Sequence, residues 1–406
     1  MDLRLLSLAF APFAFGTSAF AFVGLLVPMA DDLGVGVPLV GQLQTAFALA
    51  CAVGGPVLAR LLARFDRKYL LVGVMLLLLT MNVASALAPN VSVLMGIRII
   101  GGLIAALTLP LASSITVMLV PESRRPAALA VVLSGYTLAF ILGMPIATIL
   151  GETYGWRAAF WFAGAITVLA LPVISIWTPA KVAVAAAAGA NFKSALQGDN
   201  RRLVVLTMIG FWATFSTASY VAPVITAFSG LEGTAIGGIQ IATGIGSLLG
   251  LPAGAMLARL SARRALLILF ATATMTQAAY TMGMLYDLGA LAVPALLVVM
   301  AVGAAALFAM SPVIQTQLAM SAGASATLAF AVNGSMLYIG QGLGASLGGS
   351  VFASSSIVWV GAAGACVAAL GIIVALGLKP SKSAAPKAAE TSGPTPQIGT
   401  PALNAE

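Results

Sequence analysis

Histidine is absent from this chain of 406 residues, and charged residues make up only 7% of it. The absence of histidine excludes imidazole acid–base catalysis, histidine-bound metal ions and a histidine proton relay. Soluble globular proteins contain about 25% charged residues, so the shortage of charge argues against a soluble fold. Cysteine is also scarce. Cys51 and Cys366 each lie in a long apolar run, their spacing matches no disulfide framework, and both are interpreted as small apolar side chains.

Apolar residues dominate what is present. Hydrophobic residues account for 61% of the chain and its mean hydropathy is +1.07, which indicates that lipid is the solvent. The net charge is +8, but the basic residues form no cluster on a soluble surface that would bind a polyanion. The composition therefore predicts the lipid bilayer as a partner and excludes nucleic acid.

Runs of about 20 apolar residues, the length that crosses a bilayer core as a helix, alternate with short polar breaks. The sequence predicts an all-α membrane protein with twelve transmembrane helices and no metal site. The predicted spans cover residues 5–29, 39–60, 69–88, 92–119, 128–150, 158–178, 203–226, 235–258, 265–286, 290–318, 326–350 and 357–378.

The first run also has features of a secretory signal peptide, because Arg4 precedes an apolar stretch with small residues at 19–21. The apolar stretch continues through Val27, however, and is longer than a typical signal core. Cleavage would also leave an odd number of spans and break the pairing of the two halves of the chain. A membrane helix is therefore the favoured interpretation.

The basic residues predict the orientation, since Lys and Arg close to span ends stay on the cytoplasmic side. With the N-terminus inside, 17 of the 19 basic residues fall in cytoplasmic segments, and only Arg98 and Arg157 fall elsewhere. The sequence thus predicts a multi-pass protein of the plasma (inner) membrane with both termini in the cytoplasm. The loops on the other side hold acidic residues: Asp31, Asp32, Glu152, Glu232 and Asp287.

Two nearly identical segments lie half a chain apart: LARLLAR begins at Leu58 and LARLSAR begins at Leu257. Each joins the second and third helices of a set of six. A parallel repeat of six plus six helices is the layout of transporters whose halves rock around a central site. The end of the chain is rich in Pro, Ala, Ser and Thr and cannot bury enough surface to fold. The expected parts are an N-terminal half (1–178), a central cytoplasmic loop (179–202), a C-terminal half (203–378) and a disordered cytoplasmic tail (379–406).

The first of these segments resembles the motif of the major facilitator superfamily between helices 2 and 3, G-x-L-A-D-R-x-G-R-K. It departs from the motif at Ala63, where the family acid is common, and at Asp66, the usual glycine position. The resemblance implies a cytoplasmic gating loop, whereas the alternative is that the basic residues only fix the topology. The residues assigned to this loop are Gly55, Arg60, Arg64, Asp66, Arg67 and Lys68.

Two further motifs resemble those of drug:proton antiporters in this superfamily. The predicted fourth helix contains Leu94, Arg98, Gly102, Ala105 and Ala106, with Gly101 in place of a glutamine. The predicted fifth helix contains Gly135, Gly143, Pro145 and Gly151. With the passages 219–230 and 314–349, these motifs resemble the arabinose-efflux-permease-like branch over residues 5–378. The resemblance implies export of small organic molecules by alternating access, driven by proton exchange and without a cofactor.

Arg98 is the one charged residue placed well inside a predicted span. A charge at this depth costs about 3 kcal/mol or more unless it meets water or a partner. Arg98 is therefore a candidate for coupling to protons or substrate, and the alternative is a structurally paired arginine. Asp31 and Asp32 are candidates for coupling only if the fold draws them into a cavity mouth, because such a pair more often forms a solvated helix end.

Small residues recur every fourth position in three predicted helices, which places them on one helix face and allows close backbone approach. The resemblance pairs helix 5 with helix 8, and helix 2 with helix 11, across the two halves. We therefore expect these faces, which include the fifth-helix motif, to form interdomain contacts. The residues are Gly135, Ala139, Gly143 and Ala147; Gly246, Gly250 and Gly254; and Gly340, Gly344 and Gly348.

Uncharged polar and aromatic residues inside the spans are candidates for a substrate cavity, although each has an alternative role in hydrogen bonding between helices. As a set they favour a neutral or amphipathic substrate, since a dianion would need paired cations. The candidates are Asn82, Tyr136, Trp212, Ser216, Tyr220, Gln240, Gln277, Asn333, Tyr338 and Gln341.

Other functions are weaker interpretations. An uptake permease of the same fold stays open, because the residues barely encode transport direction. An embedded enzyme would need a nucleophile with a base, a metal cluster or paired acids at depth, and the lack of His and of acids inside the spans argues against it. A non-transporting sensor would normally add a soluble domain. We expect a functional monomer that acts on a small-molecule substrate.

Overall fold

The computed structural model describes residues 3–62, 64–121, 124–178, 196–322 and 325–379, and the regular structure in these ranges is helical. Most of the predicted central loop and nearly all of the predicted tail lie outside the described residues. The end of the predicted loop is helical, because the next helix already begins at Asp199.

The first part of the chain forms helices that cross the bundle, several of them in two pieces. They are α1 (Leu3–Phe20), the 3₁₀ turn η1 (Val23–Leu25), α2 (Leu26–Leu33), α3 (Val37–Leu61), α4 (Arg67–Ala86), α5 (Val91–Ala105), α6 (Thr108–Leu119), α7 (Arg125–Leu138), the π-helical turn η3 (Ala139–Gly143), α8 (Met144–Tyr154) and α9 (Arg157–Trp177).

The second part follows the same plan. Its helices are α11 (Asp199–Ala218), α12 (Val221–Ser229), α13 (Thr234–Leu257), α14 (Ala262–Leu285), η4 (Gly289–Leu291), α15 (Ala292–Ala322), α16 (Ala326–Ser354), η6 (Ile357–Trp359) and α17 (Val360–Leu376).

The described helices account for the predicted crossings by length and composition, with one exception. Ten helices are long and apolar enough to span a membrane, and the pair α11–α12, bent by 57°, makes an eleventh. The remaining helix, α16, has 29 residues, but its glycines, Asn333 and Gln341 lower its hydropathy. It packs against α11 and α3 inside the bundle, where a more polar helix is tolerated.

Four predicted spans that were expected to be continuous are interrupted in the structure. A proline lies within the first three residues of the second piece in each case: Pro28 in α2, Pro110 in α6, Pro145 in α8 and Pro223 in α12. Proline has no N–H and its ring clashes with the carbonyl four residues earlier, which favours an interruption at these points, although prolines elsewhere, such as Pro312 in α15, lie inside continuous helices. The π-helical turn η3 directly precedes the proline-bearing helix α8.

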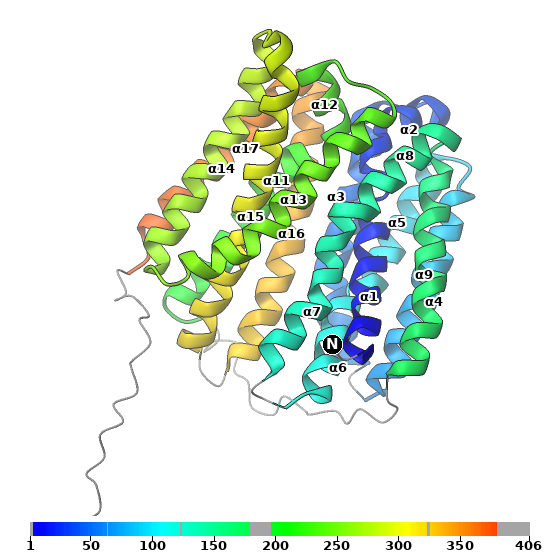
Figure 1. Cartoon of the computed structure of the whole chain (residues 1–406), viewed down its shortest axis with the longest axis vertical. Helices are drawn as coiled ribbons and strands as arrows, with labels where there is room; N and C mark the ends of the chain where they lie inside the picture. Colours follow the sequence, from blue (N-terminus) through cyan, green and yellow to red (C-terminus); the bar gives the residue numbers. More distant parts are fainter. Residues whose placement is uncertain (1–2, 63, 122–123, 179–195, 323–324, 380–406) are drawn as a thin grey trace, which may run out of the picture.

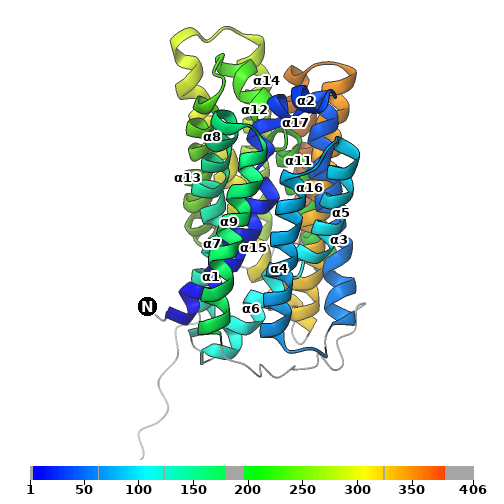
Figure 2. The same cartoon turned by 90° about the vertical axis from the view of Figure 1, so that its right-hand side faces the viewer.

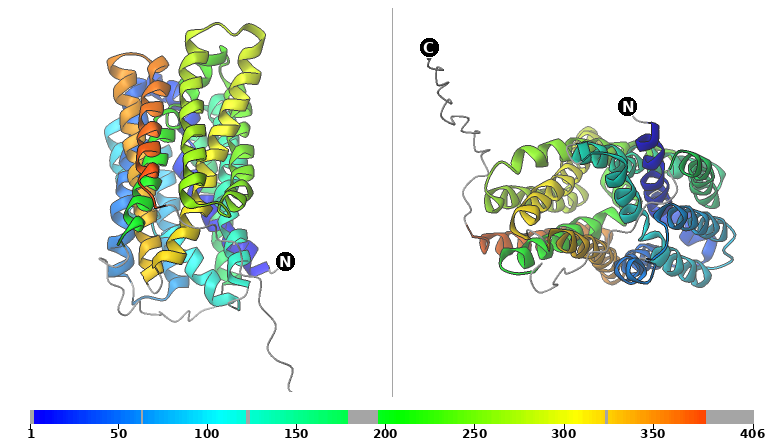
Figure 3. Two further views of the ribbon diagram at one scale, coloured as in Figure 1. Left: turned by 90° about the vertical axis from the view of Figure 1, so that its left-hand side faces the viewer. Right: turned by 90° about the horizontal axis from the view of Figure 1, so that it is seen from below.

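The helices form two groups in space. In Figure 1 the helices α1–α9 lie on one side and α11–α17 on the other, and the view from below in Figure 3 shows the same division. Contacts are extensive within each group, for example between α11 and α16 and between α4 and α9. The groups meet mainly through α16 with α3 and through α13 with α8. We call the two groups the N-terminal half and the C-terminal half.

The two ends of the bundle differ in charge. The end that carries the N-terminus and the junction of α3 with α4 holds Arg60, Arg64 and Lys68, and we call it the basic end. The opposite end carries α2 and α12 (Figure 2) and holds Asp31 and Asp32; we call it the acidic end.

Candidate functional site

Arg98 lies on α5 and is the only charged side chain that is buried among the described residues, with 4% exposed. Its two terminal nitrogens donate to the backbone carbonyls of Ser18 (3.0 Å) and Ala19 (2.8 Å). These carbonyls belong to the last turn of α1, where the break in the first span leaves backbone oxygens without helical partners. The guanidinium therefore satisfies two backbone carbonyls at the C-terminal end of α1.

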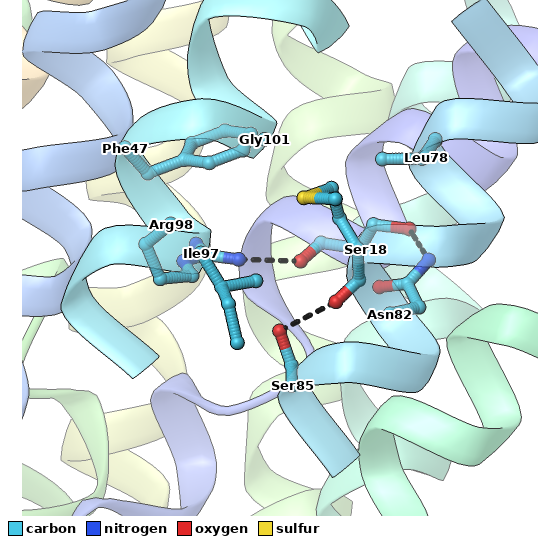
Figure 4. Close-up of a pocket in the computed structure, with 9 residues that line it drawn as sticks. Ser18, Phe47, Leu78, Asn82, Ser85, Ile97, Arg98 and Gly101 are labelled. Carbon is cyan, nitrogen blue, oxygen red and sulfur yellow. Dashed lines mark hydrogen bonds between the residues drawn. The ribbon is translucent and has the colours of Figure 1, made fainter. Parts of the chain in front are cut away.

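Aromatic rings and a small polar pocket surround the same guanidinium. Its central carbon lies 4.2 Å from the ring centre of Phe47 and 4.7 Å from that of Phe22, distances at which cation–π attraction offsets desolvation. The pocket beside it, shown in Figure 4, is lined by Ser18, Asn82 and Ser85 and has room for about one water molecule. The Arg98 Nε atom has no hydrogen-bond partner among the described residues. Arg98 therefore lies buried inside the bundle, and its hydrogen-bond partners are backbone carbonyls.

Asp31 and Asp32 lie on α2 at the acidic end of the bundle, and both are exposed. Asp32 accepts hydrogen bonds from the indole of Trp156 (2.9 Å) and from Arg157 (2.6 Å). Arg157 also donates to the carbonyl of Ala88 (3.3 Å). Asp32 thus ties the end of the first span to the start of α9, and no described contact joins either aspartate to Arg98.

The predicted gating loop lies at the basic end. Asp66 caps the N-terminus of α4, because its carboxylate accepts from the backbone N–H groups of Lys68 (2.9 Å) and Tyr69 (3.4 Å). Asp66, the acid that departs from the family motif, therefore serves as a helix cap. Ala63 lies outside the described residues. The other members of the loop set lie nearby: Gly55 and Arg60 in the last turns of α3, Arg64 with its guanidinium 5.2 Å from the Phe65 ring, and Arg67 and Lys68 in the first turn of α4.

The small-residue face of the fifth span packs against the first span, inside the N-terminal half. A Cβ atom at Gly135, Gly143 or Gly151 would clash with α1 at Ala9, with α1 at Thr17 or with η1 at Leu25, respectively. The prediction that these glycines form an interdomain contact is therefore wrong. Small residues at every fourth position predict that another helix approaches closely, but they do not indicate which helix.

The two glycine faces of the C-terminal half are also internal to that half. The face of Gly246, Gly250 and Gly254 on α13 meets the backbone of α15, and the face of Gly340, Gly344 and Gly348 on α16 meets the backbone of α11. The expected interdomain role fails for these residues for the same reason.

Other residues of the same helices make the contacts between the halves. Pro145 is one of them: a Cβ atom at Gly237 of α13 would approach the Pro145 carbonyl and the Ile149 side chain. One turn further along α13, Gln240 accepts a hydrogen bond from Thr148 (2.9 Å). The predicted pairing of the fifth span with the eighth is confirmed, and the pairing of α3 with α16 is confirmed as well.

Tyr220, at the bend between α11 and α12, is a fully buried bridge between the halves near the acidic end. Its hydroxyl lies 3.3 Å from the Pro38 carbonyl of α3 and 3.1 Å from the Ala345 carbonyl of α16. Tyr220 packs so closely against Gly41 and Gly349 that a Cβ atom at either position would clash with its side chain.

Aromatic rings occupy the centre between the halves. Phe15 of α1 stacks on Tyr136 of α7 (5.9 Å between centroids) and meets the edge of Tyr338 of α16 (6.5 Å). Phe20 contacts Phe215 of α11 (5.9 Å) across the same interface. Sequence reasoning missed these phenylalanines, since an aromatic residue in an apolar helix gives no signal of which face it occupies.

The structure brings only part of the predicted cavity set to this interface. Tyr136, Tyr220, Gln240 and Tyr338 lie there, and Gln341 lies one turn from Tyr338 on α16. The others make contacts inside one half. Asn333 accepts from Thr207 (2.6 Å), Ser216 donates to Ala213 in its own helix, Gln277 pairs with Thr217, and Asn82 donates to Ser18. Trp212 is half-buried on α11, and its indole N–H has no described partner.

Known proteins share this sequence pattern and this fold. The profile of the Major Facilitator Superfamily matches residues 6–327. The chain is 35% identical to the chloramphenicol resistance protein of Streptomyces lividans over 65% of this chain and 68% of that protein. It is 30% identical to the inner membrane transport protein YdhP of Escherichia coli (strain K12) over 91% of this chain and 94% of that protein.

One further relative and one solved structure are also similar to this chain. The match to the uncharacterized MFS-type transporter YtbD of Bacillus subtilis (strain 168) is 31% identical and spans 61% of this chain but only 64% of that relative. The crystal structure of a POT family transporter in complex with 5-aminolevulinic acid superposes with a TM-score of 0.71 over 92% of this chain and 94% of that chain. At 13% identity, this likeness shows a shared fold alone.

Proposed function

This chain belongs to the major facilitator superfamily of secondary transporters, and we propose that it exports small organic molecules by alternating access in exchange for protons. In this proposal the basic end faces the cytoplasm, both termini are cytoplasmic, and the chain works as a monomer in the inner membrane. Each half moves as a body, and the contacts between the halves open at one end while they close at the other.

The distribution of contacts between the halves carries this proposal. Toward the acidic end the halves are joined by Tyr220 with Pro38 and by Thr148 with Gln240. The contacts thus fit a conformation that is closed at the acidic end, from which substrate would load at the basic end.

The proposed cargo is drug-like or sugar-like, and one relative supports a drug-like cargo. The Streptomyces relative is named for resistance to chloramphenicol, an uncharged molecule, and the central interface of this chain lacks acidic side chains among its described residues. Arg98 is the proposed coupling residue, since it is the one buried charge and it is fastened to the break in the first span.

Overexpression in a pump-deficient bacterial host followed by a toxicity screen that includes chloramphenicol tests this function. We expect resistance to at least one compound and its uptake into inside-out vesicles when a proton gradient is applied, with collapse by a protonophore. The Arg98→Ala variant serves as the control for coupling. Counterflow of labelled compound in proteoliposomes checks transport without a gradient. Net movement of compound together with protons into cells would instead favour the uptake permease, and the absence of counterflow would contradict a transport role.

A further inference from the structure

Aromatic rings from both halves pack together at the centre between the halves. The rings of Phe15, Tyr136 and Tyr338 come from both halves and meet at centroid distances of 5.9 and 6.5 Å. Phe140 of the N-terminal half meets Phe308 of the C-terminal half at 5.6 Å. Rings in stacked and edge-on arrangements also accommodate an aromatic ligand between them, because its ring can replace one of theirs. In the proposed cycle, these side chains would line the space that opens when the halves separate.

Two buried amides in the same region have nitrogen atoms without a hydrogen-bond partner among the described residues. Gln341, one turn from Tyr338 on α16, is 2% exposed, and its Nε2 atom donates to no described atom. Gln44 is fully buried one turn from Phe47 on α3, and neither atom of its amide has a described partner. A buried polar group without a hydrogen bond destabilises the fold, so amides left in this condition are suited to a ligand that completes them.

The electrostatics of the centre disfavour a charged ligand of either sign. No acidic side chain is buried among the described residues, so an organic cation would find no counter-charge there. Arg98 is the only buried cation in that part of the chain, but both terminal nitrogens bind carbonyls and its faces are covered by Phe22 and Phe47. An anion would have to displace these contacts, and either ion would lose its hydration without compensation.

From these observations we infer that the central site selects uncharged aromatic molecules that carry a hydrogen-bond acceptor, with Gln341 as the donor that recognises the acceptor and Tyr136 as the ring that stacks on the aromatic part. This assignment rests on the proposed transport function, whose substrate class it specifies. Polar sugars would bring no aromatic ring to stack among these side chains, and organic ions would be rejected by desolvation.

Binding of three matched indoles to the purified full-length protein tests the assignment: N-acetyltryptamine is uncharged, tryptamine is a cation and indole-3-acetate is an anion. We expect equilibrium dialysis to show binding of N-acetyltryptamine at least about tenfold tighter than binding of either ion, since burial of an uncompensated charge exceeds the 1.4 kcal/mol that a tenfold ratio represents. Equal or tighter binding of an ion, or no binding of the uncharged indole, would overturn the inference.

Variants identify the residues. Gln341→Leu removes the donor at nearly constant volume and should weaken N-acetyltryptamine binding about tenfold. Gln315→Leu, on an exposed face of α15, is the matched control and should bind like wild type. If Gln341→Leu binds like the control, Gln341 is not the recognition residue. The binding assay needs no gradient, so it separates this inference from the proposed export. If the protein binds the uncharged indole but moves no compound, the proposed export alone is contradicted. If the protein exports compounds but prefers ions, this inference alone is contradicted.

Discussion

Arg98 joins two features that are separate in the sequence, a charge on α5 and a break at the end of α1. The last carbonyls of a helix need partners, and here a guanidinium supplies two donors to Ser18 and Ala19 while Phe47 covers its face. A planar fork meets these demands together, whereas an ammonium group does not. The arginine therefore sets the geometry of the first-span break as well as carrying the buried charge.

The Arg98→Ala and Arg98→Lys variants separate coupling from structure. Arg98→Ala removes two charge-assisted hydrogen bonds, each worth about 1.5–3 kcal/mol, and Arg98→Lys removes the planar fork that makes both at once, so proton-driven accumulation should fall at least about tenfold in either variant. If Arg98 couples transport to protons, counterflow in proteoliposomes should persist in Arg98→Lys while gradient-driven accumulation is lost. Parallel loss of both activities would indicate a purely structural arginine, and full proton-linked transport in Arg98→Ala would rule out coupling at this residue.

Single residues were predictable from the sequence to different degrees. The depth and rarity of the Arg98 charge followed from the apolar run around it, but its partners are backbone carbonyls, which leave no mark in the sequence. Asp66 was visible as a departure from the family motif, and its capping role required the start of α4. Gln44 was overlooked, because a lone amide in an apolar helix has no pattern that distinguishes it.

At the scale of elements, a proline accompanies the break in each of four spans, and hydropathy does not detect these breaks. Pro28, Pro110, Pro145 and Pro223 each lie in the first turn of a helix piece, and each removes one backbone hydrogen bond from an otherwise continuous apolar run. Apolar length counts crossings and ignores such interruptions. The breaks matter for the site, because Arg98 binds at one of them and Tyr220 lies at another.

The glycine faces were found correctly as places of close packing and assigned to the wrong neighbour. A helix in a six-helix half touches partners on several sides, and small residues serve any of them. The structure places Gly143 against Thr17 of the same half and Gly237 against Pro145 of the other half. These two glycines form a matched pair for an experiment on internal and interdomain packing.

Gly143→Leu should impair folding, and Gly237→Leu should impair transport. The first substitution overpacks the interior of the N-terminal half, at a typical cost of about 1–3 kcal/mol, and should lower both membrane abundance and Tm. The second pushes the halves apart at the acidic end and should leave abundance close to wild type while changing counterflow per molecule of protein. Fluorescence-detected size-exclusion chromatography and counterflow measure the two quantities. Selective loss of transport in Gly143→Leu would restore the interdomain role for that glycine.

At the scale of the whole molecule, the twofold plan was predictable and the conformation was not. The repeated segment and the alternation of basic and acidic loops indicated two sets of six helices, and the fold confirms the two-group arrangement. A transporter visits at least two conformations with one sequence, so hydropathy and motifs are the same in both. Side-chain contacts such as that of Thr148 with Gln240 support the proposed closure at the acidic end.

Cross-linking the halves at the closed end should stop the cycle. With Cys51 and Cys366 replaced by serine, Thr148→Cys and Gln240→Cys place a thiol in each half at positions that are hydrogen-bonded at 2.9 Å. A short disulfide-containing cross-linker should abolish counterflow, and reduction should restore it, because alternating access requires α8 and α13 to separate. The control pair, Asn200→Cys with Ser321→Cys, links two helices of the C-terminal half and should leave counterflow intact when cross-linked. Undiminished counterflow with the first pair cross-linked would mean that the halves do not separate at the acidic end.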